Sequence, residues 1–333
     1  MTNRRNFLKG LSALTMGGIA SQSLLSCSSP ASNKAAETAE TAEAAPATKK
    51  KIGLQTYSLG QELLKDIPNG LKRLAEMGYS ELEIFGYQDA TGKFGDYSKD
   101  NQTFVSAKDY KKMAEDAGLV ISSSHCNPTI WDYAPSNGSK FDEFWKKAVD
   151  VHAELGVKYL VQPGLPPVEN EDDAKRVTDV FNRAGEIAKK AGIKWGYHNH
   201  NMEFVPVPAG SEKPKYEKNP WRSKGTPIEE LFINNTDPEN VLFELDVYWT
   251  VMGQNDPLEW MEKYPNRIKL LHIKDRWELG ASGMMNFENI FNMAYKNGVF
   301  SFFVELERDR KGRPQFEGVE LSAKYLNNAS FVK

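Results

Sequence analysis

The sequence predicts an α/β fold: a single (β/α)8 TIM barrel over residues 51–333, preceded by a disordered N-terminal export signal and tether. The main observation is a repeated unit in which an amphipathic stretch ends in a glycine and an apolar strand follows at once. Glycine commonly ends a helix because it adopts the left-handed conformation without strain. The unit recurs at Gly78, Gly118, Gly156, Gly192 and Gly298. Repeated βα units favour a parallel sheet, and eight predicted strands favour closure into a barrel.

The expected strands are short apolar runs. They cover 52–57, 82–85, 120–121, 159–161, a run from Ile193, 241–247, 268–273 and 302–304. An open doubly wound sheet is the structural alternative. Residues 205–240 are rich in Pro, Lys and Asn, which predicts a long loop insertion on the functional rim.

The helix expected before Gly192 illustrates the helical pattern. Asn170 is placed to cap it, and acidic residues fill its first turn. Its apolar residues recur at helical spacing and form one stripe: Ala174, Val177, Val180, Phe181, Ala184, Ile187 and Ala188.

Residues 1–27 resemble a twin-arginine lipoprotein signal. Arg4 and Arg5 precede the moderately apolar stretch 11–25, and Cys27 follows as the expected lipidation site. A plain secretory signal and a disordered cytosolic leader are the alternatives. Residues 28–50 contain almost no large apolar side chain, which predicts a disordered linker. We therefore expect an exported lipoprotein on the periplasmic side that contacts the membrane only through its lipid anchor.

Composition limits the possible partners. A net charge of −3 gives no electrostatic reason to expect nucleic acid. If Cys27 is lipidated, Cys126 remains, and no disulfide framework is implied. A homo-oligomer is possible.

Ionisable residues gather at the ends of the expected strands. Four of the five histidines lie there, whereas His152 falls in a helix and is interpreted as a surface or packing residue. Alternate strand residues face the barrel interior, and the carboxyl ends open onto the functional face. Several strands carry two ionisable residues on one face: Glu244 and Asp246, His272 and Lys274, Glu305 and Glu307, and His198 and His200. This pattern predicts a metal or acid–base site, since a cation would keep buried carboxylates ionised.

These residues carry a family resemblance. The stretches YHNHNMEF (197–204), ELDVYW (244–249), HIKD (272–275) and VELE (304–307) resemble the xylose-isomerase-like barrel family of sugar isomerases and epimerases. The resemblance implies one Mn, Co, Mg or Zn ion held by Glu, Asp, His and Glu from strands five to eight. The last three ligands carry over onto Asp246, His272 and Glu305.

The strand-five ligand departs from the family pattern. His198 stands where many members have Glu, and His200 is the next inward position. Neutral imidazole binds transition metals, whereas Mg prefers oxygen, so Mn, Co or Zn is expected over Mg. A Glu at this position often serves as a base in the family, so its replacement leaves the reaction type open.

The resemblance implies that the partner is a small carbohydrate and that the reaction is proton abstraction next to its carbonyl, through an enediolate. Candidate acids and bases are Glu305, Glu307, Lys274, His200 and Glu203. Candidate substrate-binding residues are Glu83, His125, Trp131, Trp249 and Trp277, although the three tryptophans could equally be packing residues. We expect an unphosphorylated substrate, because the protein is expected outside the cytoplasm and no Gly-rich phosphate cradle follows the last strands.

Three other functions remain open at this point. A lyase or dehydratase acting on keto-sugars or 3-keto-glycosides would use the same enediolate. A non-catalytic sugar-binding lipoprotein would not need several titratable groups around a metal. A metal-dependent DNA-repair endonuclease would need more metal ions and a basic groove, which the net charge opposes.

Overall fold

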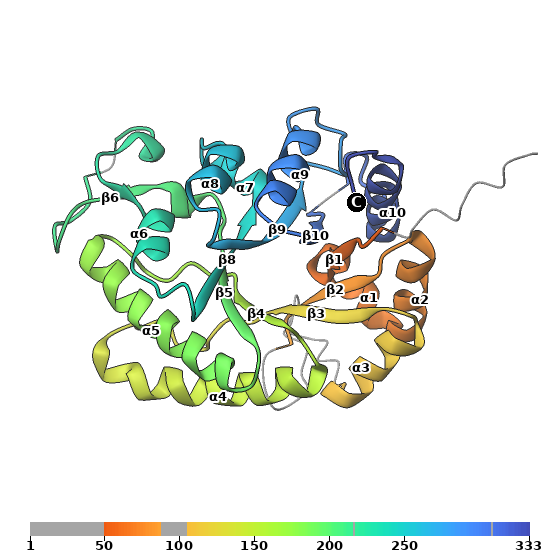
Figure 1. Cartoon of the computed structure of the whole chain (residues 1–333), viewed down its shortest axis with the longest axis horizontal. Helices are drawn as coiled ribbons and strands as arrows, with labels where there is room; N and C mark the ends of the chain where they lie inside the picture. Colours follow the sequence, from red (N-terminus) through yellow and green to blue (C-terminus); the bar gives the residue numbers. More distant parts are fainter. Residues whose placement is uncertain (1–49, 88–104, 216, 308) are drawn as a thin grey trace, which may run out of the picture. The chain divides into compact units, whose positions relative to one another are not determined.

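The computed structural model describes residues 50–87, 105–215, 217–307 and 309–333. Within this part of the chain, eight parallel strands close into a barrel in the order β1-β10-β9-β8-β5-β4-β3-β2 (Figure 1). The strands are β1 (Gly53–Gln55), β2 (Glu81–Phe85), β3 (Val120–His125), β4 (Tyr159–Gln162), β5 (Lys194–His198), β8 (Val241–Asp246), β9 (Ile268–Lys274) and β10 (Ser301–Glu305). The predicted TIM barrel is confirmed, and the pairing of β1 with β10 excludes the open sheet. The expected signal, the linker up to residue 49 and Cys27 lie outside the described residues.

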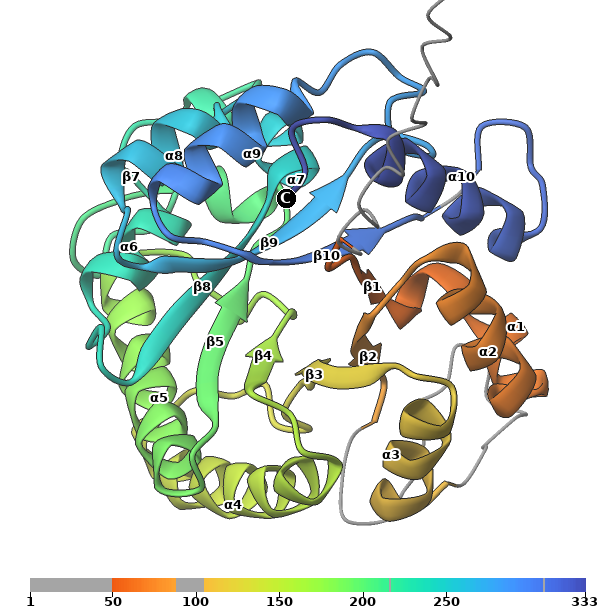
Figure 2. The same ribbon diagram turned by 45° about the vertical axis from the view of Figure 1, so that its right-hand side comes forward.

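Helices surround the ring of strands (Figure 2). They are α1 (Gln61–Lys65), α2 (Ile67–Met77), α3 (Ala107–Asp116), α4 (Gly138–Leu155), α5 (Glu171–Lys190), α6 (Ile228–Asn234), α7 (Val247–Met252), α8 (Pro257–Lys263), α9 (Phe287–Lys296) and α10 (Gln315–Asn328). Single 3-10 turns are η1 (Thr56–Leu59), η2 (Pro135–Asn137), η3 (Met202–Phe204) and η4 (Pro220–Arg222). Among the described residues, we find no helix whose length and apolar character would suffice to cross a bilayer.

The predicted helix–glycine–strand units are present. Gly156, for example, has φ of 83° directly after α4, a backbone conformation that a side chain would strain. Asn170 caps α5 as expected, because its side chain accepts a hydrogen bond from the Asp173 amide. The expected stripe of α5 is buried except for Ile187, which is half-buried.

The segment 205–240 contains more regular structure than the predicted loop. It includes the antiparallel pair β6 (Pro206–Val207) and β7 (Thr226–Pro227), followed by α6. The α6 residues Ile228, Leu231 and Phe232 are buried, and the Phe232 ring lies 5.2 Å from that of Phe181 in α5. The prediction missed α6 because this helix is short and comes directly after a polar, proline-rich stretch.

The barrel interior is layered. Its floor is apolar and consists of Val161, Leu242, Leu270 and Phe303. Glycines make room for two of these side chains, since a Cβ at Gly53 would lie 2.5 Å from Phe303 and one at Gly196 would lie 2.5 Å from Leu242. Two residues further along the same strands, the interior side chains are Glu244, His272 and Glu305. The polar site therefore begins directly above a hydrocarbon floor, towards the carboxyl ends of the strands.

Candidate metal centre

Four buried side chains at the carboxyl side of the barrel form a possible metal-binding group. Single ligand atoms of His198, Asp246, His272 and Glu305 all lie within 4.8 Å of one another. The Nδ1 atom of His272 lies 2.7 Å from Glu305 Oε2 and 3.8 Å from Asp246 Oδ2. We call these four residues the upper group. It contains the four residues that the sequence predicted as metal ligands.

The position of Asp246 follows from local structure. It is the last residue of β8 and the N-cap of α7, where one carboxylate oxygen accepts a hydrogen bond from the Trp249 amide at 2.8 Å. Its own backbone amide donates to the Asn199 side chain at 3.1 Å. The second carboxylate oxygen, Oδ2, is buried and has no hydrogen-bond partner among the described residues. The helix cap thus fixes the side chain while leaving one oxygen available.

The donor set of the upper group fits a divalent cation. Besides Asp246 Oδ2, the buried Nδ1 atom of His198 has no hydrogen-bond partner within the described part of the chain. Burial raises the pKa of Asp246 to about 7, and it lowers the pKa of His198 well below its usual value. A cation would offset the cost of the buried carboxylate and would use the neutral imidazole as a ligand.

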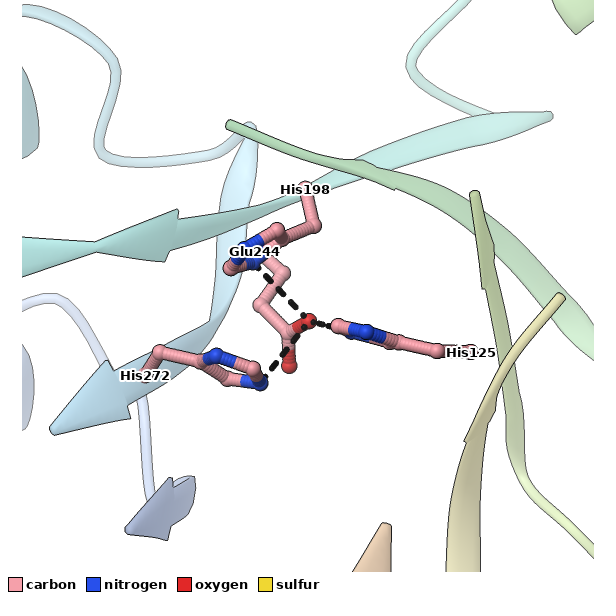
Figure 3. Close-up of side chains that lie close together, drawn as sticks. All are labelled: His125, His198, Glu244 and His272. Atoms are coloured by element: carbon pink, nitrogen blue, oxygen red, sulfur yellow. Dashed lines mark hydrogen bonds and ion pairs between the residues drawn. The ribbon is translucent and has the colours of Figure 1, made fainter. Parts of the chain in front are cut away.

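A second possible metal-binding group lies partly below the first. In Figure 3 the rings of His125, His198 and His272 surround Glu244. Their nitrogens lie 2.8, 3.5 and 3.4 Å from the same oxygen, Glu244 Oε2. We call these four residues the lower group, and it shares His198 and His272 with the upper group.

Glu83 lies beside the lower group and is fully buried. Its Oε1 atom accepts a hydrogen bond from Gln55 Nε2 at 2.7 Å and lies 2.6 Å from His272 Nε2 and 3.0 Å from His125 Nε2. Its Oε2 atom accepts from Ser123 Oγ. Burial alone would raise the pKa of Glu83, but the two histidines outweigh it and hold the pKa below its usual value. Glu83 is therefore an ionised acceptor in a fixed position.

His125 lies between two buried carboxylates. Burial opposes its charge, but Glu83 and Glu244 outweigh burial and raise the pKa of His125 to about 9. The sequence interpretation assigned Glu83 and His125 to substrate binding. In the structure, both belong to what we call the deep cluster, which consists of the lower group together with Glu83, Gln55 and Ser123.

Lys274 joins the metal-binding region to the end of β10. Its Nζ atom lies 2.9 Å from Glu305 Oε1 and 2.9 Å from Glu307 Oε1. Its ammonium also lies 4.9 Å from the centre of the Trp249 ring. Burial would lower the pKa of Lys274, but Glu305, Asp246 and Glu307 raise it, so the side chain stays charged. The side chain of Glu307 is 40% exposed, which makes it the most accessible of these carboxylates.

His200 lies on the β5 side of the same region. Its ring centre is 5.0 Å from that of His198 and 5.8 Å from that of Trp249. Burial lowers the pKa of His200 to about 4, so the imidazole is neutral near pH 7. His200 and Glu307 thus approach the region from strands that are not neighbours in the barrel.

Some predicted residues lie apart from both groups. Glu203 accepts a hydrogen bond from the Tyr197 hydroxyl at 2.7 Å, and Tyr197 packs against helix residues such as Phe181, on the side of β5 opposite His198. Trp131 is 42% exposed on the loop after β3, and the Trp277 ring lies beside Arg276. Trp249 lies against the site residues Lys274 and His200. The helical His152 is buried and not on the surface.

The sequence interpretation did not include four polar residues among its site candidates. Three of them, Glu244, Gln55 and Ser123, belong to the deep cluster. The fourth is Tyr57, whose phenol has a raised pKa because it is partly buried and lies near the carboxylates of Glu307 and Glu305. Glu244 shares its strand face with Asp246, which was a usable signal. Gln55 and Ser123 carry no charge pattern that would mark them.

Comparisons with known proteins agree with the barrel fold. A family model described as xylose isomerase-like TIM barrel matches residues 71–329. A crystal structure of a sugar phosphate isomerase/epimerase from Parabacteroides distasonis is 67% identical, with a TM-score of 0.82, and covers 87% of this chain and 100% of its own. A second sugar phosphate isomerase/epimerase from the same organism is 48% identical, with a TM-score of 0.75, and covers 85% and 100%.

Relatives named for another activity are more distant. An inosose dehydratase from Clostridium beijerinckii is 22% identical over 320 residues, or 84% of this chain and 96% of the relative. An inosose dehydratase from Bacillus cereus is 27% identical over 135 residues, so the match spans only 39% of that relative's length.

Proposed function

Because this chain belongs to the xylose isomerase-like TIM barrel family, we propose that it is a metal-dependent carbohydrate isomerase or epimerase. It removes a proton from the carbon next to a sugar carbonyl and returns it to the other face or to the neighbouring carbon. One observation supports this most directly: the upper group combines two imidazoles and two carboxylates, and Lys274 and Glu307 lie alongside.

His198, Asp246, His272 and Glu305 would hold the cation, and Mn, Co or Zn suits the two imidazoles better than Mg does. When bound there, a divalent cation polarises the sugar carbonyl and lowers the pKa of the adjacent carbon acid.

The proton transfers belong to side chains beside the upper group. Glu307 has an exposed carboxylate and His200 a neutral imidazole, and they approach from the ends of β10 and β5. Either group can remove the proton, and in the isomerase the same group returns it to the neighbouring carbon. In the epimerase the opposite group takes a proton from solvent and gives it to the other face. Lys274 remains charged and stabilises the negative charge that develops on the substrate oxygen. Glu203 is turned towards Tyr197 and is the weaker candidate.

The proposed substrate is a sugar without a phosphate group. The Lys274 ammonium beside the upper group is already paired with Glu305 and Glu307. Its positive charge is therefore not available to bind a phosphate group. The Trp249 ring beside it offers an apolar face of the kind that stacks on a sugar ring. The names of the two Parabacteroides distasonis relatives include phosphate, so sugar phosphates belong in the substrate panel.

Dehydration is the second candidate reaction. The inosose dehydratase that matches over most of its length favours it. The same enediolate would expel a β-leaving group, for example from a keto-sugar or a 3-keto-glycoside.

Two experiments test these proposals. Purified protein should contain about one equivalent of divalent metal, and His272→Ala and Asp246→Ala should lose it while keeping the fold; full retention in both variants would defeat the site. Incubation with ketoses, 3-keto-glycosides and sugar phosphates in heavy water then separates the reactions. Deuterium incorporation without bond cleavage supports the epimerase, release of water or an aglycone supports the lyase, and no turnover contradicts both.

We also propose that the protein is exported and anchored through a lipid on Cys27, with the barrel on the periplasmic side. Labelled palmitate should enter the wild type and not Cys27→Ser. Light scattering of the detergent-free barrel, residues 51–333, tests the possible homo-oligomer.

A further inference from the structure

The upper and lower groups share both His198 and His272, which limits how many cations they can hold. A neutral imidazole has one nitrogen with a lone pair and one that carries a proton. Neither shared histidine can therefore serve one ion through each nitrogen unless it loses a second proton. The two groups are accordingly alternative positions for one ion and not a pair of sites.

The two nitrogens of His272 face different layers of the barrel. Nδ1 faces the upper group, 2.7 Å from Glu305 Oε2, and Nε2 faces the deep cluster, 2.6 Å from Glu83 Oε1. If the proton is on Nε2, the Nδ1 lone pair is directed towards Glu305 and Asp246. If the proton is on Nδ1, the lone pair is directed towards Glu83 and Glu244. The tautomer of His272 thus selects the position of the ion.

Glu83 favours the first of these tautomers. Its carboxylate is fixed by Gln55 and Ser123, and its Oε1 atom lies within hydrogen-bond distance of His272 Nε2. His125 lies between Glu83 and Glu244 and keeps the two carboxylates in one place. On the Nδ1 side, Asp246 Oδ2 is buried without a hydrogen-bond partner among the described residues, so the upper position supplies a ligand that nothing else uses.

We propose that Glu83 is a positioning residue that accepts the Nε2–H of His272, fixes its tautomer and so directs Nδ1 to the cation in the upper group. Hydrogen bonds of this kind to metal-binding histidines orient the ring and raise its basicity. The inference rests on the proposed metal site and assigns to Glu83 a role other than substrate contact.

The test compares Glu83→Gln with Glu81→Gln. Glu81 is on the same strand and the same strand face, but its carboxylate accepts a hydrogen bond from the Ser122 hydroxyl and not from a histidine. Zinc affinity of the purified barrel, measured by competition with a chelator, should fall about 10- to 100-fold in Glu83→Gln and stay at the wild-type value in Glu81→Gln. Equal affinity in Glu83→Gln and wild type would overturn the proposal.

A second readout does not depend on any variant. In ¹⁵N-histidine-labelled wild type loaded with zinc, His272 should show a protonated Nε2 and a zinc-shifted Nδ1. Zinc on Nε2 would refute the proposal even if Glu83→Gln failed to fold. If the wild type does not bind zinc at all, the proposed metal site itself is wrong. Zinc binding without turnover of any sugar would defeat only the proposed function, and the affinity ratio would still decide the role of Glu83.

Discussion

Lys274 and Glu307 form an ion pair of 2.9 Å in which the lysine is almost fully buried and the glutamate is 40% exposed. The same ammonium lies 2.9 Å from the buried Glu305. The pair therefore connects the proposed metal ligands to the solvent-accessible end of the site.

Replacement of Lys274 should lower the stability of the fold. Lys274→Met removes the ammonium beside the buried Glu305 and leaves His272 as its remaining partner, so the free energy of unfolding should fall by about 3 kcal/mol. Lys263→Met is the matched control, because Lys263 forms a 2.8 Å pair with Glu230 but is 52% exposed. An exposed pair contributes about 1 kcal/mol or less. Chemical denaturation measures both, and equal losses in the two variants would contradict the assigned burial effect.

Glu307→Gln should separate catalysis from metal binding. Glu307 is not in the upper group, so metal content should stay at the wild-type level. As a general base, Glu307 should be worth about 100-fold or more in kcat. Steady-state kinetics and metal analysis on the same sample test this. A fall in kcat that metal loss fully explains would remove Glu307 from the mechanism.

The fold and the shared inner face of the upper-group residues could be predicted from short periodicities, whereas their assignment as metal ligands came from the family resemblance. The glycines after each helix mark the units, and alternation along a strand places Asp246, His272 and Glu305 on the inner face. Neighbouring strands then bring these residues together, because Asp246 is in register with His272 and Glu305 is in register with Lys274, two residues further along the same strand.

The deep cluster could not be predicted in the same way. The contact of Glu83 with His272 joins residues that are far apart in sequence, and it depends on the stagger of strands across the barrel. The alternation of side chains along a strand predicts which face of the strand Glu83 is on. It does not predict how deep in the barrel Glu83 lies or which residue it contacts. Glu203 follows the predicted histidines closely, but η3 turns the chain and directs it to Tyr197.

His152 should make the protein less stable in acid. Burial lowers the pKa of His152 to about 4, against about 6.5 in an unfolded chain. The unfolded state therefore binds the proton first, and stability is lost as pH falls from about 6.5 to about 4, by at most about 3 kcal/mol. His152→Gln should flatten this part of the stability profile relative to wild type. Val149→Ala, a buried change in the same helix without a titratable group, should lower the whole profile without changing its slope.

Gly185→Ala should destabilise the protein although alanine favours helices. A Cβ at Gly185 in α5 would lie 2.2 Å from the backbone oxygen of Asn240, directly before β8. Overpacking of this kind costs about 1–3 kcal/mol, which exceeds or cancels the gain of about 1 kcal/mol in helix propensity. Gly138→Ala is the control, because the three atoms nearest to its Cβ all belong to the flexible Arg183 guanidinium, the first at 2.9 Å. Chemical denaturation measures both variants. If Gly185→Ala were more stable than Gly138→Ala, the close approach of α5 to the start of β8 would not be what requires a glycine at position 185.

Trp249 should contribute to substrate binding through both its ring and its indole nitrogen. The ring lies beside Lys274 and His200, and the buried Nε1–H has no acceptor among the described residues. Trp249→Phe keeps an aromatic face but removes the donor, so KM should rise about tenfold, the worth of one hydrogen bond. Trp249→Ala should also lose the stacking face and raise KM further. In both variants the backbone amide that binds Asp246 remains, so α7 should stay capped and metal content should not change. The control is Trp277→Ala, which removes a ring that lies beside Arg276. An equal rise in KM in this variant would show that the effect of replacing Trp249 is not specific to the site.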